Sequence, residues 1–149
     1  MNITYVFDMD GTIADLYGVE NWLEYLIDGD PYPYANAKPM CNFSKLAKAL
    51  NKAKARGDSI EIISWLSKNS NGEYDMLVTE AKLRWLKKHL PSVTFDNIYI
   101  VPYGTPKHKV TKARNAILFD DEERNREEWL LHKGYAFTPD KIFDLLERK

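Results

Sequence analysis

The stretch that decides the fold is YVFDMDGT, residues 5–12, in which an apolar run leads into two aspartates spaced i, i+2 and then Gly-Thr. The apolar run over 3–7 predicts a short buried strand, and Asp10-Gly11 predicts a sharp turn soon after it. Two carboxylates this close raise each other's pKa unless a cation lies between them or one of them carries a proton. The stretch therefore indicates a site at the end of a strand.

Downstream of this stretch, strand-like and helix-like segments alternate. Short β-branched runs predict strands, and apolar residues at helical spacing predict helices. Such alternation predicts an α/β fold, a doubly wound parallel sheet with flanking helices, in one domain over residues 1–149. The expected strands are 3–7, 59–63, 97–101, 115–119 and 134–137, and the expected helices are 43–56, 75–90, 122–133 and one that opens at 138–139.

Capping residues mark the ends of the expected helices. Asn42 is the candidate N-cap of helix 43–56, and Gly57 closes it. Asp75 is the candidate N-cap of the next helix, which Pro91 stops. Thr138 caps the last helix, with Pro139 at its first position.

Residues 17–42 interrupt the alternation. This segment is rich in aromatic residues and contains three prolines between the first strand and the first long helix. It predicts a minimal, cap-like insertion over the carboxyl edge of the sheet, with a short helix at 19–27 followed by a loop.

Composition narrows the class of protein. The 149 residues carry a formal net charge of −1, which gives no bulk attraction to polymeric nucleic acid or to a membrane surface. Cys41 is the only cysteine, so an intrachain disulfide is excluded. The N-terminus lacks the pattern of a signal peptide, and no apolar run approaches the roughly 18 residues that span a bilayer. We expect a cytoplasmic protein; its oligomeric state is left open by the sequence.

Polar side chains follow several expected strands. Asp8 and Asp10 follow the first, Ser64 the second, and Asp120 and Asp121 the strand 115–119. A basic cluster, 105–112, follows the strand 97–101. Ligands of open α/β sheets bind beyond the carboxyl ends of the strands, and carboxylates gathered there favour a hard cation such as Mg²⁺ shared with a phosphate. The pattern indicates a phosphoryl-transfer site.

Each of these features also has a purely structural interpretation. Asp10-Gly11 is a common turn, Asp120 and Asp121 could cap the Glu-rich helix behind them, and Ser64 could be an ordinary strand-end hydroxyl. The lysines of 105–112 could form a solvated loop. Their joint order at four strand ends favours the functional interpretation.

That order resembles the four motifs of the haloacid dehalogenase-like (HAD) phosphohydrolases, carried here by VFDMDGTIAD, IIS, the lysine cluster and ILFDDEERN. The resemblance covers nearly the whole chain. Within the superfamily the chain is most similar to the small 5′(3′)-deoxyribonucleotidases and related phage or bacterial proteins. It has Ser64-Trp65 where those enzymes usually have Thr and a small residue, and its insertion is shorter than their helical cap.

The resemblance implies roles for the acidic residues. Asp8 is the expected nucleophile, which forms an aspartyl-phosphate, and Asp10 the expected general acid and base. Mg²⁺ is expected to be held by Asp8, the backbone carbonyl of Asp10 and Asp120, with Asp121 as a ligand or a support.

It also implies phosphate ligands. These are Ser64, one lysine, and the amide or hydroxyl of Thr12. Among Lys107, Lys109 and Lys112, the spacing to the acidic pair favours Lys109.

The implied activity is Mg²⁺-dependent hydrolysis of a small phosphomonoester, with a (deoxy)nucleoside monophosphate as the expected substrate. Tyr17, Trp22 and Trp65 are the candidates for stacking on a nucleobase; for Trp22, packing of the insertion against the sheet is the favoured alternative. Three other functions stay open: phosphatase action on another metabolite, a response-regulator-like receiver, for which the motif order is wrong, and a catalytically silent metal-binding module.

Overall fold

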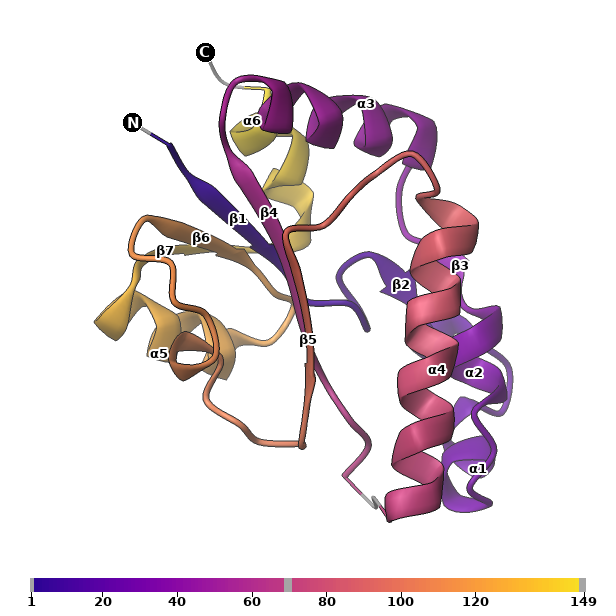
Figure 1. The fold of residues 1–149 in the computed structure, drawn as a ribbon. Coiled ribbons are helices and arrows are strands. Elements are labelled where there is room, and N and C mark those ends of the chain that lie inside the picture. Colours follow the sequence, from indigo (N-terminus) through magenta and orange to yellow (C-terminus); the bar gives the residue numbers. More distant parts are fainter. Residues whose placement is uncertain (1, 69–70, 148–149) are drawn as a thin grey trace.

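The computed structural model describes residues 2–68 and 71–147, which form a five-stranded parallel sheet with helices on both faces (Figure 1). The strand order is β5-β4-β1-β6-β7, so the first strand lies at the centre and the chain winds outward in both directions. The predicted doubly wound α/β fold is confirmed. In these described residues, no helix is both long and apolar enough to cross a membrane. The strands are β1 (Thr4–Phe7), β4 (Ser59–Trp65), β5 (Asn97–Val101), β6 (Ala116–Phe119) and β7 (Gly134–Phe137).

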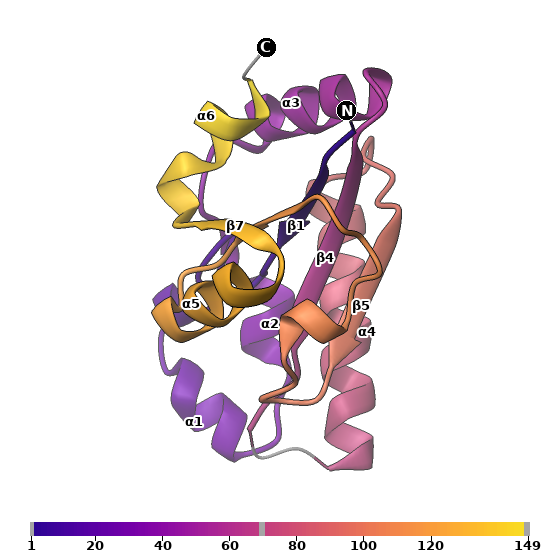
Figure 2. The same ribbon diagram turned by 90° about the vertical axis from the view of Figure 1, so that its left-hand side faces the viewer.

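Side-chain alternation along the strands divides the core between the two faces of the sheet. Tyr5 and Phe7 of β1 belong to the larger core cluster, together with α3 (Phe43–Ala55), α4 (Gly72–His89) and α6 (Ile142–Leu146). Val6, between them, points to the opposite face and packs in the cluster of α5 (Glu123–His132). Figure 2 shows α5 separated by the sheet from α4.

The helix ends agree with the sequence in one place and differ in another. The Asn42 side chain accepts from the Lys45 N–H at 3.1 Å, so the predicted cap of α3 is confirmed. The expectation that Asp75 caps the next helix is wrong. The cap of α4 is Asn71, whose side chain accepts from the Tyr74 N–H at 2.9 Å, which leaves Asp75 inside the first turn.

The segment 17–42 has more regular structure than expected. It begins within η1 (Leu16–Gly18) and contains α1 (Trp22–Ile27), near the expected helix, and a second helix, α2 (Tyr32–Asn36), where a loop was expected. Its base is closed by an antiparallel pair, β2 (Ala14–Asp15) and β3 (Lys38–Pro39). Tyr34 of α2 is buried in a cluster with α4, whereas α1 has no buried side chain.

Candidate active site

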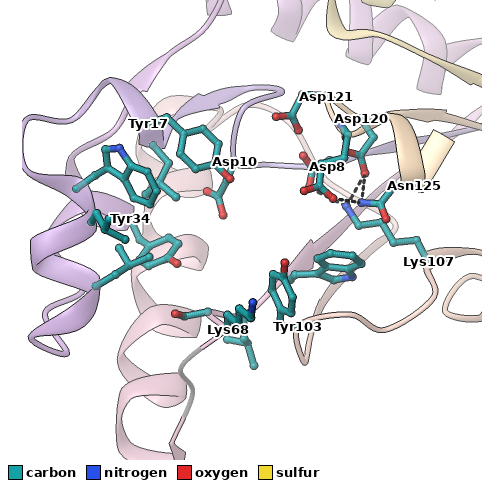
Figure 3. Close-up of a pocket in the computed structure, with 18 of the residues that line it drawn as sticks. Asp8, Asp10, Tyr17, Tyr34, Lys68, Tyr103, Lys107, Asp120, Asp121 and Asn125 are labelled. Atoms are coloured by element: carbon teal, nitrogen blue, oxygen red, sulfur yellow. Dashed lines mark hydrogen bonds and ion pairs between the residues drawn. The ribbon is translucent and has the colours of Figure 1, made fainter.

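The carboxyl edge of the sheet opens into a cavity of about 290 Å³. Asp8 directly follows β1 and Asp120 directly follows β6, and the Asp8 N–H donates to the Phe119 carbonyl at 3.0 Å. Figure 3 shows Asp8, Lys107, Asp120 and Asn125 gathered on one side of this cavity, with Tyr17 and Tyr34 opposite. The two acidic motifs, more than a hundred residues apart, meet here because β1 and β6 are adjacent parallel strands.

Lys107 links the two acidic motifs. Its Nζ donates to Asp8 Oδ1 at 2.7 Å and to Asp120 Oδ2 at 2.8 Å, and its side chain is 3% exposed. Burial alone would lower the pKa of Lys107, but the charges of Asp8 and Asp120 outweigh it and raise that pKa. Lys107 is therefore a fixed positive charge between two carboxylates.

Asp120 is held on its other side by the beginning of α5. Its Oδ1 accepts from the Glu122 N–H at 2.9 Å, and its Oδ2 accepts from the Asn125 side chain at 3.1 Å. Burial and the nearby Asp8 charge raise the pKa of Asp120, and Lys107 partly opposes them. Asn125 was not among the sequence candidates, although its place in the first turn of the helix after the acidic pair was a usable signal.

Asp8, Asp120 and Asp121 form the candidate metal centre. Each offers a carboxylate oxygen, and these oxygens lie within 4.8 Å of one another. Partial desolvation of the Asp121 carboxylate and the charge of Asp8 raise the pKa of Asp121, although the residue as a whole is exposed, so a cation beside it would favour its ionised form. Oxygen-only ligands of this kind fit a hard divalent ion. The Asp10 side chain is not part of this cluster, and the use of its backbone carbonyl stays a prediction.

The turn after β1 fits tightly against the second acidic motif. Gly11 has φ +82°, and a Cβ there would lie 2.2 Å from Asp121 Oδ2, so a side chain at this position would displace Asp121. Thr12, next to it, donates its hydroxyl to Asp8 Oδ2 at 2.9 Å, and its N–H donates to the Met9 carbonyl at 3.1 Å. Both Thr12 donors are thus used within the protein, and the residue orients Asp8 instead of lining the cavity.

Asp10 lines the cavity and is paired with a lysine that the sequence analysis missed. Its Oδ2 accepts from Lys82 Nζ at 3.0 Å. Burial raises the pKa of Asp10, and the charge of Lys82 opposes this effect. The signal for Lys82 was its position: it lies four residues after Val78 and four before Leu86, both buried, so a charge stands in an apolar stripe of α4.

Ser64 lies inside β4, not after it as expected. The strand continues to Trp65, so Ser64 shares a sheet face with Ile62, beneath α4, and Trp65 lies on the other face with Ile63. Ser64 is 1% exposed, accepts from Lys82 Nζ at 2.5 Å and is absent from the cavity wall.

The lysine chosen from spacing is not the one that the structure brings to the carboxylates. Lys109 is exposed, whereas Lys107 is the lysine bonded to Asp8 and Asp120. The reason is local geometry: both lie on η2 (Lys107–Lys109), a 3₁₀ helix with about three residues per turn, so side chains two apart point in different directions. A count of residues to the acidic pair cannot detect this.

Aromatic and apolar side chains line the rest of the cavity. Trp65 donates its indole N–H to the Thr105 carbonyl at 2.8 Å, and its ring lies 5.0 Å from that of Tyr103 and 5.5 Å from Lys107 Nζ. On the insertion side, Trp22 contacts Tyr17 edge-on at 4.9 Å and lines the cavity, so the favoured alternative of packing against the sheet is not what the structure shows.

Comparison with known proteins identifies the fold. Neither a protein-family model nor a curated protein matches the sequence. Among solved structures, a D,D-heptose 1,7-bisphosphate phosphatase from Burkholderia thailandensis matches with a TM-score of 0.57 and 14% identity, over 90% of this chain and 75% of that chain. A chain of a Pnkp1/Rnl/Hen1 complex matches with a TM-score of 0.59 and 18% identity, over 93% of this chain and 46% of that one. The chain thus has a HAD-like α/β fold and spans less than half of the second neighbour.

Proposed function

We propose that the protein is a HAD-type phosphatase that hydrolyses a small phosphomonoester with the help of Mg²⁺, and that its substrate is a (deoxy)nucleoside monophosphate. The observation that carries the proposal is the cluster of Asp8, Asp120 and Asp121, the first two bonded to Lys107, in a cavity with aromatic walls. The motif resemblance and the fold shared with a sugar bisphosphate phosphatase support it.

In the proposed reaction Asp8 is the nucleophile. Its two oxygens are oriented by Lys107 and Thr12, so the carboxylate is fixed before substrate arrives. An Asp8 oxygen forms a bond to phosphorus while the bond from phosphorus to the ester oxygen breaks, which leaves a phosphoryl group on Asp8. Asp8, Asp120 and Asp121 would hold Mg²⁺, which would supply positive charge to the phosphoryl oxygens.

Asp10 is the proposed proton carrier. In its protonated form it gives a proton to the departing alcohol oxygen, and the resulting carboxylate takes a proton from the water that attacks phosphorus in the second step. That attack breaks the bond between Asp8 and phosphorus and releases inorganic phosphate. The raised pKa of Asp10 suits a group that must hold a proton near neutral pH.

The walls of the cavity support a nucleotide over a smaller ester. Leu23 and Ile27 of α1 are 53% and 66% exposed and line the cavity, as do Tyr17, Trp22 and Tyr103. An apolar surface beside a phosphate site suits the flat face of a base, and a cavity of about 290 Å³ suits a mononucleotide better than a polymer.

A substrate screen tests the proposal. Hydrolysis of deoxynucleoside monophosphates, sugar phosphates and p-nitrophenyl phosphate is measured with Mg²⁺ and with a chelator, using Asp8→Asn as the control. We expect Mg²⁺-dependent release of phosphate with the highest kcat/KM on nucleotides. A preference for sugar phosphates would contradict the nucleotide assignment, and no turnover of any ester would contradict the enzyme, leaving a receiver or a silent metal-binding module.

A further inference from the structure

Lys82 is a buried charge that the reaction described above does not use. It lies on α4, its side chain is 1% exposed, and it belongs to none of the four motifs. Burying an ammonium group is costly unless its donors are satisfied. Each of its three N–H bonds has a partner: Asp10 Oδ2 at 3.0 Å, Ser64 Oγ at 2.5 Å and the Trp65 carbonyl at 2.8 Å.

The two aspartates of the first motif are bonded to different lysines. Asp8 is bonded to Lys107, which also binds Asp120, whereas Asp10 is bonded to Lys82. Within the described residues, the two lysines share no carboxylate partner. Lys107 therefore contacts the proposed nucleophile and the candidate metal centre, and Lys82 contacts Asp10, which lines the cavity.

Lys82 also fixes Asp10 relative to rigid elements. It is held by the α4 backbone, and its other two bonds go to the end of β4. Asp10 itself stands in a turn after β1, where a carboxylate without a partner would be free to rotate about its side-chain bonds. The bond to Lys82 uses Oδ2, which leaves Oδ1 for exchange of a proton with substrate or water.

We propose that Lys82 is a positioning residue for proton transfer, which acts through Asp10 by holding its carboxylate in the orientation needed at the leaving oxygen. This inference rests on the proposed phosphatase function. It assigns to Lys82 a role separate from that of Lys107, because loss of Lys82 affects protonation of the leaving group, whereas loss of Lys107 affects Asp8 and the metal centre.

A leaving-group comparison distinguishes this role from a structural one. The hydroxyl of a nucleoside is a poor leaving group that needs a proton, whereas p-nitrophenolate leaves readily without one. The parameter kcat/KM reports steps up to the release of the alcohol, so it isolates the transfer in which Asp10 acts as the acid. In Lys82→Met, kcat/KM for a deoxynucleoside monophosphate should fall by about 10²-fold or more, within the range of proton-transfer contributions, and kcat/KM for p-nitrophenyl phosphate should fall far less.

Two controls are available: another lysine of α4, and a double variant of Lys82 and Asp10. Lys87→Met, at an exposed position of α4, should keep both kcat/KM values. In an Asp10→Asn background, Lys82→Met should cause little further loss on the nucleotide, because both changes remove the same function. Lys82→Gln, with folding checked by circular dichroism, replaces Lys82→Met if the latter does not fold.

The outcomes are distinct. Equal losses on the two esters, or a full additional loss in the Asp10→Asn background, would overturn the role of Lys82 while leaving the phosphatase in place. A wild-type protein that hydrolyses neither ester would overturn the proposed function and this inference with it.

Discussion

The two sides of the cavity are built in opposite ways. On the carboxylate side, Asp8, Lys107 and Asp120 are all less than 10% exposed, and Lys107 is bonded to both carboxylates. On the insertion side, α1 has no buried side chain and leaves Leu23 more than half exposed. The first side has one arrangement fixed by its charges, and the second is an apolar surface that substrate can cover.

This difference predicts which substrates are affected by a change on each side of the cavity. Changes on the carboxylate side should impair turnover of every phosphate ester, because each substrate presents the same phosphoryl group. Changes on the insertion side should affect only substrates that are long enough to reach it.

The largest effect is expected for the nucleophile. Asp8→Asn is nearly isosteric, so the fold should be kept while turnover of all esters is abolished, because an amide cannot form the aspartyl-phosphate. Steady-state assays with a thermal unfolding control measure both properties. Near-wild-type turnover by a folded Asp8→Asn protein would contradict the role of Asp8 as nucleophile, and with it the expected effect of changes on the carboxylate side.

The next effect concerns the two lysines of η2. Lys107→Ala leaves Asp8 and Asp120 buried without their shared cation, which should lower the free energy of unfolding by about 3–5 kcal/mol and impair turnover of all esters. Lys109→Ala is the matched control, and as an exposed change it should stay within about 0.5 kcal/mol. Denaturant titration of both variants decides it; equal stabilities would mean that Lys107 does not link the motifs.

A smaller difference is expected within the acidic pair. Asp120→Ala should weaken Mg²⁺ binding more than Asp121→Ala, because Asp120 is buried and oriented by Lys107, Asn125 and the Glu122 N–H, whereas Asp121 is exposed. Calorimetric titration of Mg²⁺ into the two variants measures the ranking. Equal affinities would show that both carboxylates are equivalent ligands.

The smallest effect should come from the aromatic wall. Trp65→Ala removes a ring beside Lys107 and should raise KM for a nucleotide, within the roughly 1–3 kcal/mol that stacking on a base contributes. KM for a small alkyl phosphate should change less. If both KM values rise equally, Trp65 supports the phosphate end of the cavity and does not bind the base.

The sequence was sufficient for those parts of the site that depend on strand order. Asp8 and Asp120 follow apolar strands, and adjacent parallel strands place both at one edge, so their meeting could be predicted. The break in the alternation of strands and helices predicts the insertion 17–42, and some of its side chains line the cavity.

The remainder depends on side-chain direction, which periodicity does not give. Ser64 was expected beyond a strand end, but two further residues of β4 put it beneath α4. Lys107 and Lys109 differ only in the side of a 3₁₀ turn on which they lie, and Lys82 reaches Asp10 from a helix more than seventy residues along the chain. Long, flexible lysine side chains make such contacts hard to predict from spacing.

The most direct test of the central claim is a search for the phosphoryl group on Asp8. The wild-type protein is mixed with Mg²⁺ and a deoxynucleoside monophosphate, quenched rapidly in acid, digested and mapped by mass spectrometry. The account predicts one added phosphoryl group on the peptide that contains Asp8, and none in Asp8→Asn. A phosphoryl group found on another residue, or rapid turnover while no phosphoryl group forms on Asp8 at any quench time, would contradict it.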